Sequence, residues 1–133
     1  MGAQEDADLV RRGYEAFIAG DMEWLNEHLH ENIVWHVPGK NVLSGDYRGR
    51  EAVLAFFARS VSIAIPEFDM HDVVASDDHV VALLNATWRR NDNGETFQDH
   101  LVQVFHVDNG QAIEVWTMQD DLEGLDAFLA GVS

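Results

Sequence analysis

Alternating apolar and polar positions run through the second half of the chain and predict three long strands. We expect these strands at His79–Arg90, Glu95–Val107 and Gln111–Gln119. The two connections between them end in Asn93-Gly94 and Asn109-Gly110, and such a pair between apolar runs favours a tight hairpin because both residues tolerate positive φ. Strands of about ten residues span roughly 30 Å. The pattern therefore predicts an antiparallel meander that is broad enough for helices to pack on.

Three segments in the first half of the chain carry apolar residues at helical spacing. They are residues 7–19, Met22–Leu29 and Gly49–Ser60. Gly20 can end the first helix and Asp21 can cap the second, so that the two form a helical hairpin. The positions that we expect to face inward are Val10, Tyr14, Phe17, Ile18, Met22, Leu25, Leu29, Val53, Phe56 and Phe57.

The remaining segments complete an α+β pattern. A short strand is predicted at Ile33–Val37 and a loop at residues 39–49, while Pro66 marks a break before a further strand at Glu67–Ala75. Asp121 can cap a closing helix. We therefore predict a single domain over residues 1–133, a cone-shaped roll in which a strongly curved antiparallel sheet packs against three N-terminal helices, with a short C-terminal helix. The mouth of such a cone can hold a cavity.

The net charge of the chain limits the classes of partner that it can bind. Its 24 acidic and 8 basic side chains give a formal charge of −16, which disfavours nucleic acid and anionic membrane surfaces. The chain has no cysteine, so disulfides, thiolate catalysis and cysteine-bound zinc are excluded. The acidic first residues lack the features of a signal peptide, and no apolar run is long enough to cross a bilayer. We expect a cytoplasmic protein.

Both faces of the predicted meander contain apolar side chains. One face is expected to be covered by the helices, and the apolar side chains of the other face need another surface to bury them. We expect a homodimer through this outer face, with Trp116, Val102 and Val104 as contact residues.

Asp99 and Gln103 lie among apolar neighbours on one face of the second meander strand. A carboxyl group in such a place must be paired, be hydrated or have its pKa raised by desolvation, and a raised pKa suits proton transfer near neutral pH. Alternatively, Asp99 caps unpaired backbone groups or pairs with Arg89 or Arg90 near the end of the strand. A functional role in a cavity and a structural role both remain open.

His36 follows Trp35 at the end of the short first strand, where the mouth of a cavity would lie. A neutral histidine there could act as a base, an acid or a hydrogen-bond donor, or it could be a packing residue. His28 and His30 lie across a helix end and would not converge on one ion, and the other four histidines, His71, His79, His100 and His106, have no carboxylate at metal-ligand spacing. We therefore expect neither a metal nor a cofactor.

Four segments resemble one known family. EAFIAGDMEWL at Glu15–Leu25, VWHVPG at Val34–Gly39, GDYRGREAVLAF at Gly45–Phe56 and VFHVDNGQAIEVW at Val104–Trp116 are similar to the SnoaL-like branch of the nuclear transport factor 2-like superfamily. The resemblance implies the curved sheet and helical cone, a dimer through the sheet and a hydrophobic pocket. Its relatives include ketosteroid isomerases, polyketide cyclases, limonene epoxide hydrolases and dehydratases, so it also implies cofactor-free acid–base chemistry on a small apolar molecule.

The resemblance to the isomerases is incomplete at their functional positions. Their base, an aspartate, falls on His36 or Val37, and their oxyanion-hole aspartate falls near Gln103. Their oxyanion-hole tyrosine falls near Gly13, with Tyr14 one position away. These departures argue against steroid isomerisation.

Two other branches suggest further residues. The aspartate that the cyclases carry after the tryptophan of the last strand matches Asp120, which could equally be a neighbour of the helix cap Asp121. The Asp-Arg-Asp set of the epoxide hydrolases is not evident, although Arg90 and Asp99 keep this alternative open.

We therefore consider three hypotheses for the function, namely an enzyme and two alternatives. In the enzyme, a cyclase, isomerase or hydrolase, His36, Asp99 or Asp120 moves the proton, and Tyr14 or Gln103 binds the developing oxyanion. The alternatives are a protein that binds a small apolar ligand without converting it, and a structural dimer whose cone has collapsed. The apolar wall of the pocket is expected to consist of Trp35, Trp88, Phe105, Phe17, Phe56 and Val115.

Overall fold

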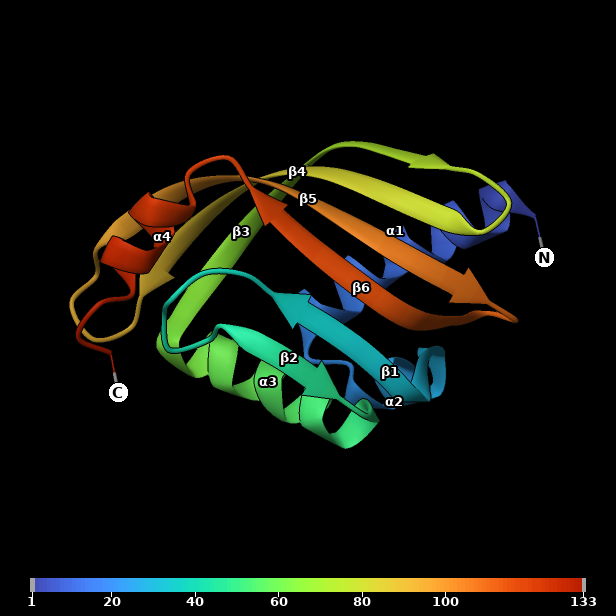
Figure 1. The fold of residues 1–133 in the computed structure, drawn as a ribbon, viewed down its shortest axis with the longest axis horizontal. Coiled ribbons are helices and arrows are strands. Elements are labelled where there is room, and N and C mark those ends of the chain that lie inside the picture. Colours follow the sequence, from blue (N-terminus) through green and yellow to red (C-terminus); the bar gives the residue numbers. More distant parts are fainter. Residues whose placement is uncertain (1, 133) are drawn as a thin grey trace.

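The computed structural model describes residues 2–132, and within this range it contains four helices and six strands (Figure 1). The predicted α+β class and the order of the predicted elements are confirmed. The elements are α1 (Ala3–Ala19), α2 (Met22–His28), β1 (Leu29–Val37), β2 (Gly45–Arg48), α3 (Arg50–Ile63), β3 (Ala64–Ala75), β4 (His79–Arg90), β5 (Thr96–Asp108), β6 (Gln111–Gln119) and α4 (Leu122–Phe128).

The six strands form one curved sheet in the order β2-β1-β6-β5-β4-β3. Strands β3 to β6 are the predicted antiparallel meander. Strand β1 lies parallel to β6, with Trp35 beside Val115, and this parallel pair was not predicted. As Figure 1 shows, the sheet bends around helices α1, α2 and α3, and α4 lies at the end of the sheet where β6 ends.

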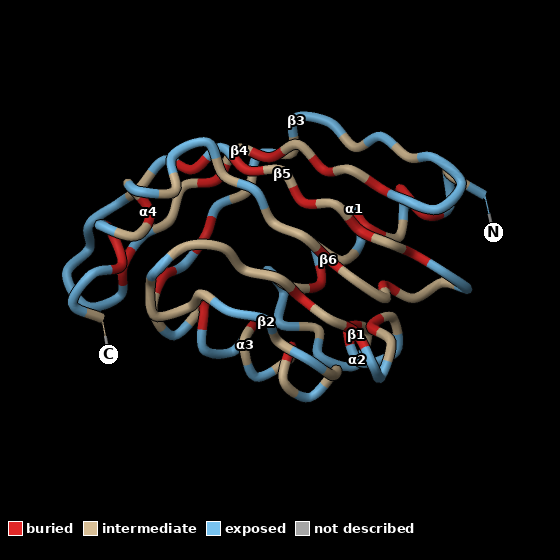
Figure 2. Tube along the Cα trace, viewed as in Figure 1, coloured by how far each residue is buried: buried red, intermediate tan, exposed pale blue. Residues whose placement is uncertain are grey.

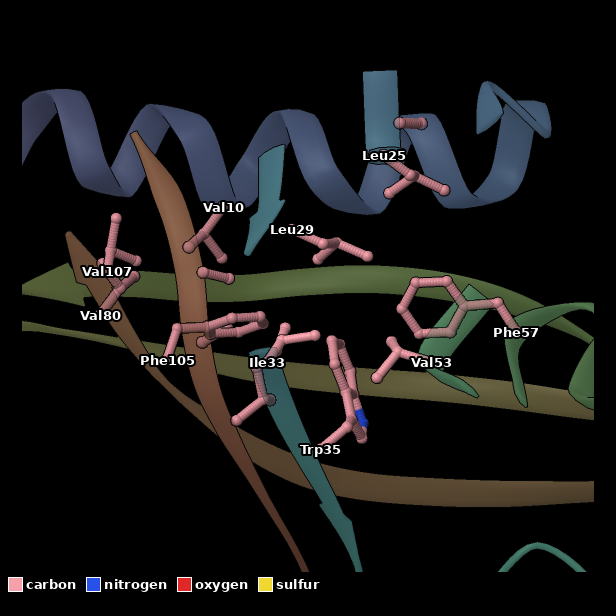
Figure 3. Packing of buried hydrophobic residues seen from close by; sticks show 14 of the residues in the cluster. Val10, Leu25, Leu29, Ile33, Trp35, Val53, Phe57, Val80, Phe105 and Val107 are labelled. Carbon is pink, nitrogen blue, oxygen red and sulfur yellow. The ribbon is translucent and has the colours of Figure 1, made fainter. Parts of the chain in front are cut away.

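The hydrophobic core lies between the concave face of the sheet and the helices. Ile33, Val53, Val80 and Val115 are completely buried there. Figure 3 shows side chains of the sheet, Phe105 among them, facing Val10 of α1. Along β4 and β5 buried residues alternate with more exposed ones (Figure 2), which is the period of two that a strand imposes on its side chains.

Local chemistry explains where the first helices begin and end. Helix α1 starts at Ala3, earlier than predicted, and its first turn contains Glu5 and Asp6, whose negative charges favour a helix N-terminus. Gly20 ends α1 in the left-handed conformation with φ 70°. The side chain of Asp21 then caps α2 by accepting a hydrogen bond from the backbone N–H of Trp24 at 3.1 Å.

Both edge strands differ from the prediction. The predicted loop at residues 39–49 contains the four-residue strand β2, which pairs with β1. Strand β3 begins at Ala64 and runs through Pro66, which was predicted to be a break. An edge strand can be as short as β2 or can contain a proline, because it pairs on one side only and the missing N–H of the proline can face outward.

Two positions move to another element or another face. Leu29 was assigned to the second helix but is the first residue of β1. A register shift between His106 and Val107 places Ala112 opposite Val107. Ala112 is buried, although strict alternation along β6 would place it on the same outer face as Trp116. The extra residue of a bulge changes the face of the residues on one side of it.

Candidate functional site

A cavity of about 160 Å³ lies between the concave face of the sheet and the helices. Its wall is almost entirely apolar and is built from all four helices and from strands β1, β3, β4, β5 and β6. Trp35, Trp88, Phe105, Phe17 and Phe56 line it, as expected from the sequence. Val115 does not, because it is completely buried behind the wall.

Edge-to-face aromatic contacts hold this wall in place. The Trp35 ring packs against Phe57 with the centroids 5.0 Å apart and against Phe105 at 6.0 Å. Phe17 of α1 meets the same Phe57 at 5.3 Å. Such pairs contribute about 0.5–1.5 kcal/mol each beyond the burial of their area. The rings thus tie α1, α3, β1 and β5 together around the cavity.

A chain of hydrogen bonds crosses the cavity wall from Tyr14 to Thr117. The Tyr14 hydroxyl donates to Oε1 of Gln103, and Nε2 of Gln103 donates to Oγ1 of Thr117 at 3.0 Å. All three residues line the cavity. Burial raises the pKa of Tyr14 well above 10.0, so the phenol keeps its proton and acts as a donor. Thr117 accepts from Gln103 and therefore has its own hydroxyl hydrogen left to donate.

Asp99 of β5 is a buried acid at the end of the cavity near α4. Its side chain is only 1% exposed. Nε1 of Trp88 donates to its Oδ2 at 3.2 Å, and Nε2 of Gln119 donates to the same oxygen at 3.0 Å. Burial raises the pKa of Asp99 and outweighs the two hydrogen bonds, which act in the opposite direction. Asp99 lies behind the cavity wall, whereas its partners Trp88 and Gln119 are part of it.

The predicted alternative that Asp99 pairs with Arg90 is wrong. The Arg90 guanidinium forms an ion pair with Asp92, at 2.5 Å, and donates to the backbone carbonyl of Phe128 at 2.8 Å. It therefore anchors the end of α4 instead of meeting Asp99. Arg89, the other proposed partner, is exposed. Because Arg90 is bonded to Asp92 and Phe128, it does not form the Asp-Arg-Asp set of the epoxide hydrolases with Asp99.

His36 lies on the outer face of the sheet, so the expectation that it stands at the mouth of the cavity is wrong. Strand alternation turns Trp35 inward and His36 outward. The ring nitrogen Nδ1 of His36 lies 2.7 Å from Asp46, and Nε2 lies 2.6 Å from Glu114. The hydrogen bond to Glu114 has the largest effect and raises the pKa of His36, and the hydrogen bond to Asp46 raises it further. The ring also stacks over Trp116 at 5.9 Å.

Asp120 does not face the cavity either. It is exposed, and its backbone N–H donates to the carbonyl of His100 at 3.2 Å. The cap of α4 is Asp121, whose side chain accepts from the N–H of Gly124 at 2.9 Å. Of the five residues predicted to carry chemistry, the structure brings Tyr14, Gln103 and Asp99 to the cavity region.

Sequence reasoning missed three contributors to the site. Thr117 and Gln119 share the inward face of β6 with Val115, and this alternation of polar residues with an apolar one was the available signal. Trp88 was expected to be a wall residue only, whereas its indole N–H also binds Asp99.

Two further properties concern residues 2–132. No group of three or more His, Asp or Glu side chains in this range could hold a metal ion. None of the helices in this range combines the length and the apolarity needed to cross a membrane.

A curved sheet wrapped around three helices, with an apolar cavity inside, defines the nuclear transport factor 2-like class of fold. The chain belongs to the SnoaL-like family, since the model of the SnoaL-like domain matches residues 10–115. It is 33% identical over 80 residues to an uncharacterized protein of Mycobacterium tuberculosis strain H37Rv, an alignment that covers 59% of this chain and 61% of that protein.

Solved structures agree with this assignment. Bal32a, from a soil-derived mobile gene cassette, is 35% identical with a TM-score of 0.86, covering 96% of this chain and 98% of its own. An NTF2-like protein from Burkholderia xenovorans LB400 is 25% identical with a TM-score of 0.89 over 98% and 99% of the two chains. IdmH from Streptomyces antibioticus, a candidate polyketide cyclase, has a TM-score of 0.73 over 89% and 94%, and its 23% identity shows the fold alone.

Proposed function

We propose that this protein is a cofactor-independent acid–base enzyme that acts on a small hydrophobic molecule held in the cavity. The observation that carries the proposal is Asp99, a buried carboxyl group with a raised pKa beside an apolar cavity. Proton transfer near neutral pH requires a carboxyl group tuned in this direction. The likeness to the candidate polyketide cyclase IdmH is consistent with this class of chemistry.

In this proposal Asp99 exchanges a proton with the substrate, and Thr117 stabilises negative charge that develops on a substrate oxygen. The free hydroxyl hydrogen of Thr117 is the donor, and the bonds from Gln103 and Tyr14 fix its orientation. Thr117 and Gln119, the partner of Asp99, are successive inward residues of β6 and are therefore about 7 Å apart. One small molecule can span this distance.

The test begins with the ligand that the protein retains. Native mass spectrometry of the purified protein identifies any co-purified molecule, which is then offered to the protein as a substrate. We expect Asp99→Asn to reduce turnover by at least about a hundredfold, which is the usual contribution of a general acid or base. Asp77→Asn is the matched control, because Asp77 is exposed and does not line the cavity. Equal rates for the wild type and Asp99→Asn would refute the role of Asp99.

A protein that binds the same ligand without converting it is the second candidate. It is favoured by the position of Asp99 behind the cavity wall, where a substrate must reach past Trp88 and Gln119. Recovery of the bound ligand unchanged, together with equal affinity in the wild type and in Asp99→Asn, would support this candidate. A collapsed structural cone is disfavoured by the cavity of about 160 Å³.

A further inference from the structure

Two oxygen atoms at the α4 end of the cavity region accept no hydrogen bond from any group in residues 2–132. They are Oδ1 of Asp99 and Oε1 of Gln119, and both are fully buried. The two side chains are already neighbours, because Nε2 of Gln119 donates to Oδ2 of Asp99 at 3.0 Å. A buried polar atom without a partner costs about 1–3 kcal/mol, so a ligand that supplies the partner gains binding free energy here.

The chemistry of the two oxygens defines what fits between them. Burial raises the pKa of Asp99 and so favours, relative to an exposed aspartate, the protonated form in which Oδ1 can donate a hydrogen bond, whereas an ionised Oδ1 can only accept one. Oε1 of Gln119 can only accept. A hydroxyl group complements both, since it accepts one hydrogen bond and donates another. A ketone or an ether accepts from Asp99 but leaves Oε1 of Gln119 without a donor.

We propose that Asp99 and Gln119 form a subsite for a hydroxyl group, so that the cavity selects apolar ring molecules that carry an alcohol or a phenol. Gln119 lines the cavity and presents the subsite to it, while the aromatic wall holds the hydrocarbon part. This inference rests on the proposed function in that it assigns a ligand class to the same cavity, but it concerns binding and does not require turnover.

A neutral hydroxyl suits the site better than an ammonium group. Burial raises the pKa of Asp99 and so disfavours the ionised form with which an ammonium group could pair, and the rest of the wall is almost entirely apolar. Burying an unpaired cation there would cost far more than burying a neutral donor. The chain's acidity therefore does not make this cavity a cation site.

The test compares indane, 1-indanone and 1-indanol, which share a carbon skeleton and differ in hydrogen bonding. Their affinities for the wild-type protein are measured by isothermal titration calorimetry. We expect 1-indanol to bind about tenfold more tightly than either of the others, since one satisfied hydrogen bond is worth about that factor. In Gln119→Met, which removes the acceptor at similar length, the affinity for 1-indanol should fall to that for 1-indanone. Gln98→Met is the matched control, because Gln98 is exposed on the outer face of β5.

The outcomes separate this inference from the proposed function. Equal or tighter binding of 1-indanone overturns the hydroxyl subsite and leaves the apolar pocket in place. Failure of all three compounds to bind overturns the subsite and the ligand pocket together. A preference for 1-indanol supports the subsite whether or not any compound is turned over. The wild-type series decides the matter even if the Gln119 variant does not fold.

Discussion

Asp99 combines deep burial with two donors on one of its oxygens and, among the residues that the structure describes, none on the other. The donors, Trp88 and Gln119, orient the carboxyl group, while burial favours its protonated form. This arrangement has a consequence for stability as well as for chemistry. A group whose neutral form is preferred in the folded protein releases its proton less readily there than in the unfolded chain.

The first prediction concerns Asp99→Asn and pH. The folded pKa of Asp99 lies above the ordinary value of 3.8 for an aspartate, so the unfolded chain ionises first as pH rises. The free energy of unfolding of the wild type therefore falls between these two pKa values and stays lower above them. We expect Asp99→Asn to gain stability relative to the wild type as pH rises from 4 to 7.5, as measured by urea denaturation. A difference that is constant across this range would contradict the raised pKa.

The second prediction concerns Tyr14→Phe. This change removes the donor to Oε1 of Gln103 within an apolar wall, and it should lower the free energy of unfolding by about 1–3 kcal/mol. Tyr47→Phe is the control, because the Tyr47 hydroxyl donates to the carbonyl of Leu43 at 2.7 Å from a less buried position. The control should lose about 1 kcal/mol or less. Equal losses of unfolding free energy in urea denaturation would mean that burial does not strengthen the hydrogen bond between Tyr14 and Gln103 relative to that of Tyr47.

At the scale of elements, the outer face of β1 carries a cluster formed by His36, Asp46 and Glu114. The cluster joins three strands, since Asp46 belongs to β2 and Glu114 to β6. It lies on the opposite face from the cavity. Its role in this structure is therefore to hold the edge of the sheet together.

The third prediction follows from the raised pKa of His36. The ion pairs stabilise the folded state fully below the ordinary pKa of 6.5 and lose this contribution as pH rises through the raised folded pKa. We expect the wild type to exceed His36→Gln in stability by up to about 1 kcal/mol at pH 6, with little difference at pH 9. The pKa itself is read from an NMR titration of the His36 ring. An NMR pKa below 6.5 would contradict the prediction.

The elements that sequence reasoning placed correctly are those with a strong local pattern. The long meander strands and helix α1 have clear periods, whereas β2 consists of four residues in a segment rich in turn-forming residues. The site was harder to predict. Gln103 was found because a polar residue is unusual among apolar neighbours on a strand, and Tyr14 was found through the family resemblance, but the hydrogen bond between them joins residues far apart in the chain. His36 and Asp120 were misplaced because a residue type indicates chemistry but not the direction in which a side chain points.

At the scale of the whole molecule, the outer face of the sheet is the surface that we expect to form a homodimer. Trp116, Val102 and Val104 are only partly buried there in the single chain. A charge of −16 on each chain opposes association, since like charges repel over roughly 10 Å at 0.1 M salt.

The fourth prediction concerns this dimer. Sedimentation equilibrium should show a dimer whose dissociation constant decreases as sodium chloride rises from 20 to 200 mM, since salt screens the repulsion. Val104→Asp should weaken the dimer by at least about tenfold, because it buries an unpaired charge. A wild type that stays monomeric at every salt and protein concentration would refute the prediction.

The parallel join between β1 and β6 also has a consequence for biosynthesis. Trp35 and Val115 are roughly 80 residues apart in sequence, and contacts of such separation form late because closing the intervening loop costs entropy. A ribosome releases β1 long before β6 exists. The apolar inner face of β1 therefore stays exposed on the nascent chain until translation is almost complete and β6 can pair with it. During that interval it depends on chaperones, or on transient collapse, to escape aggregation.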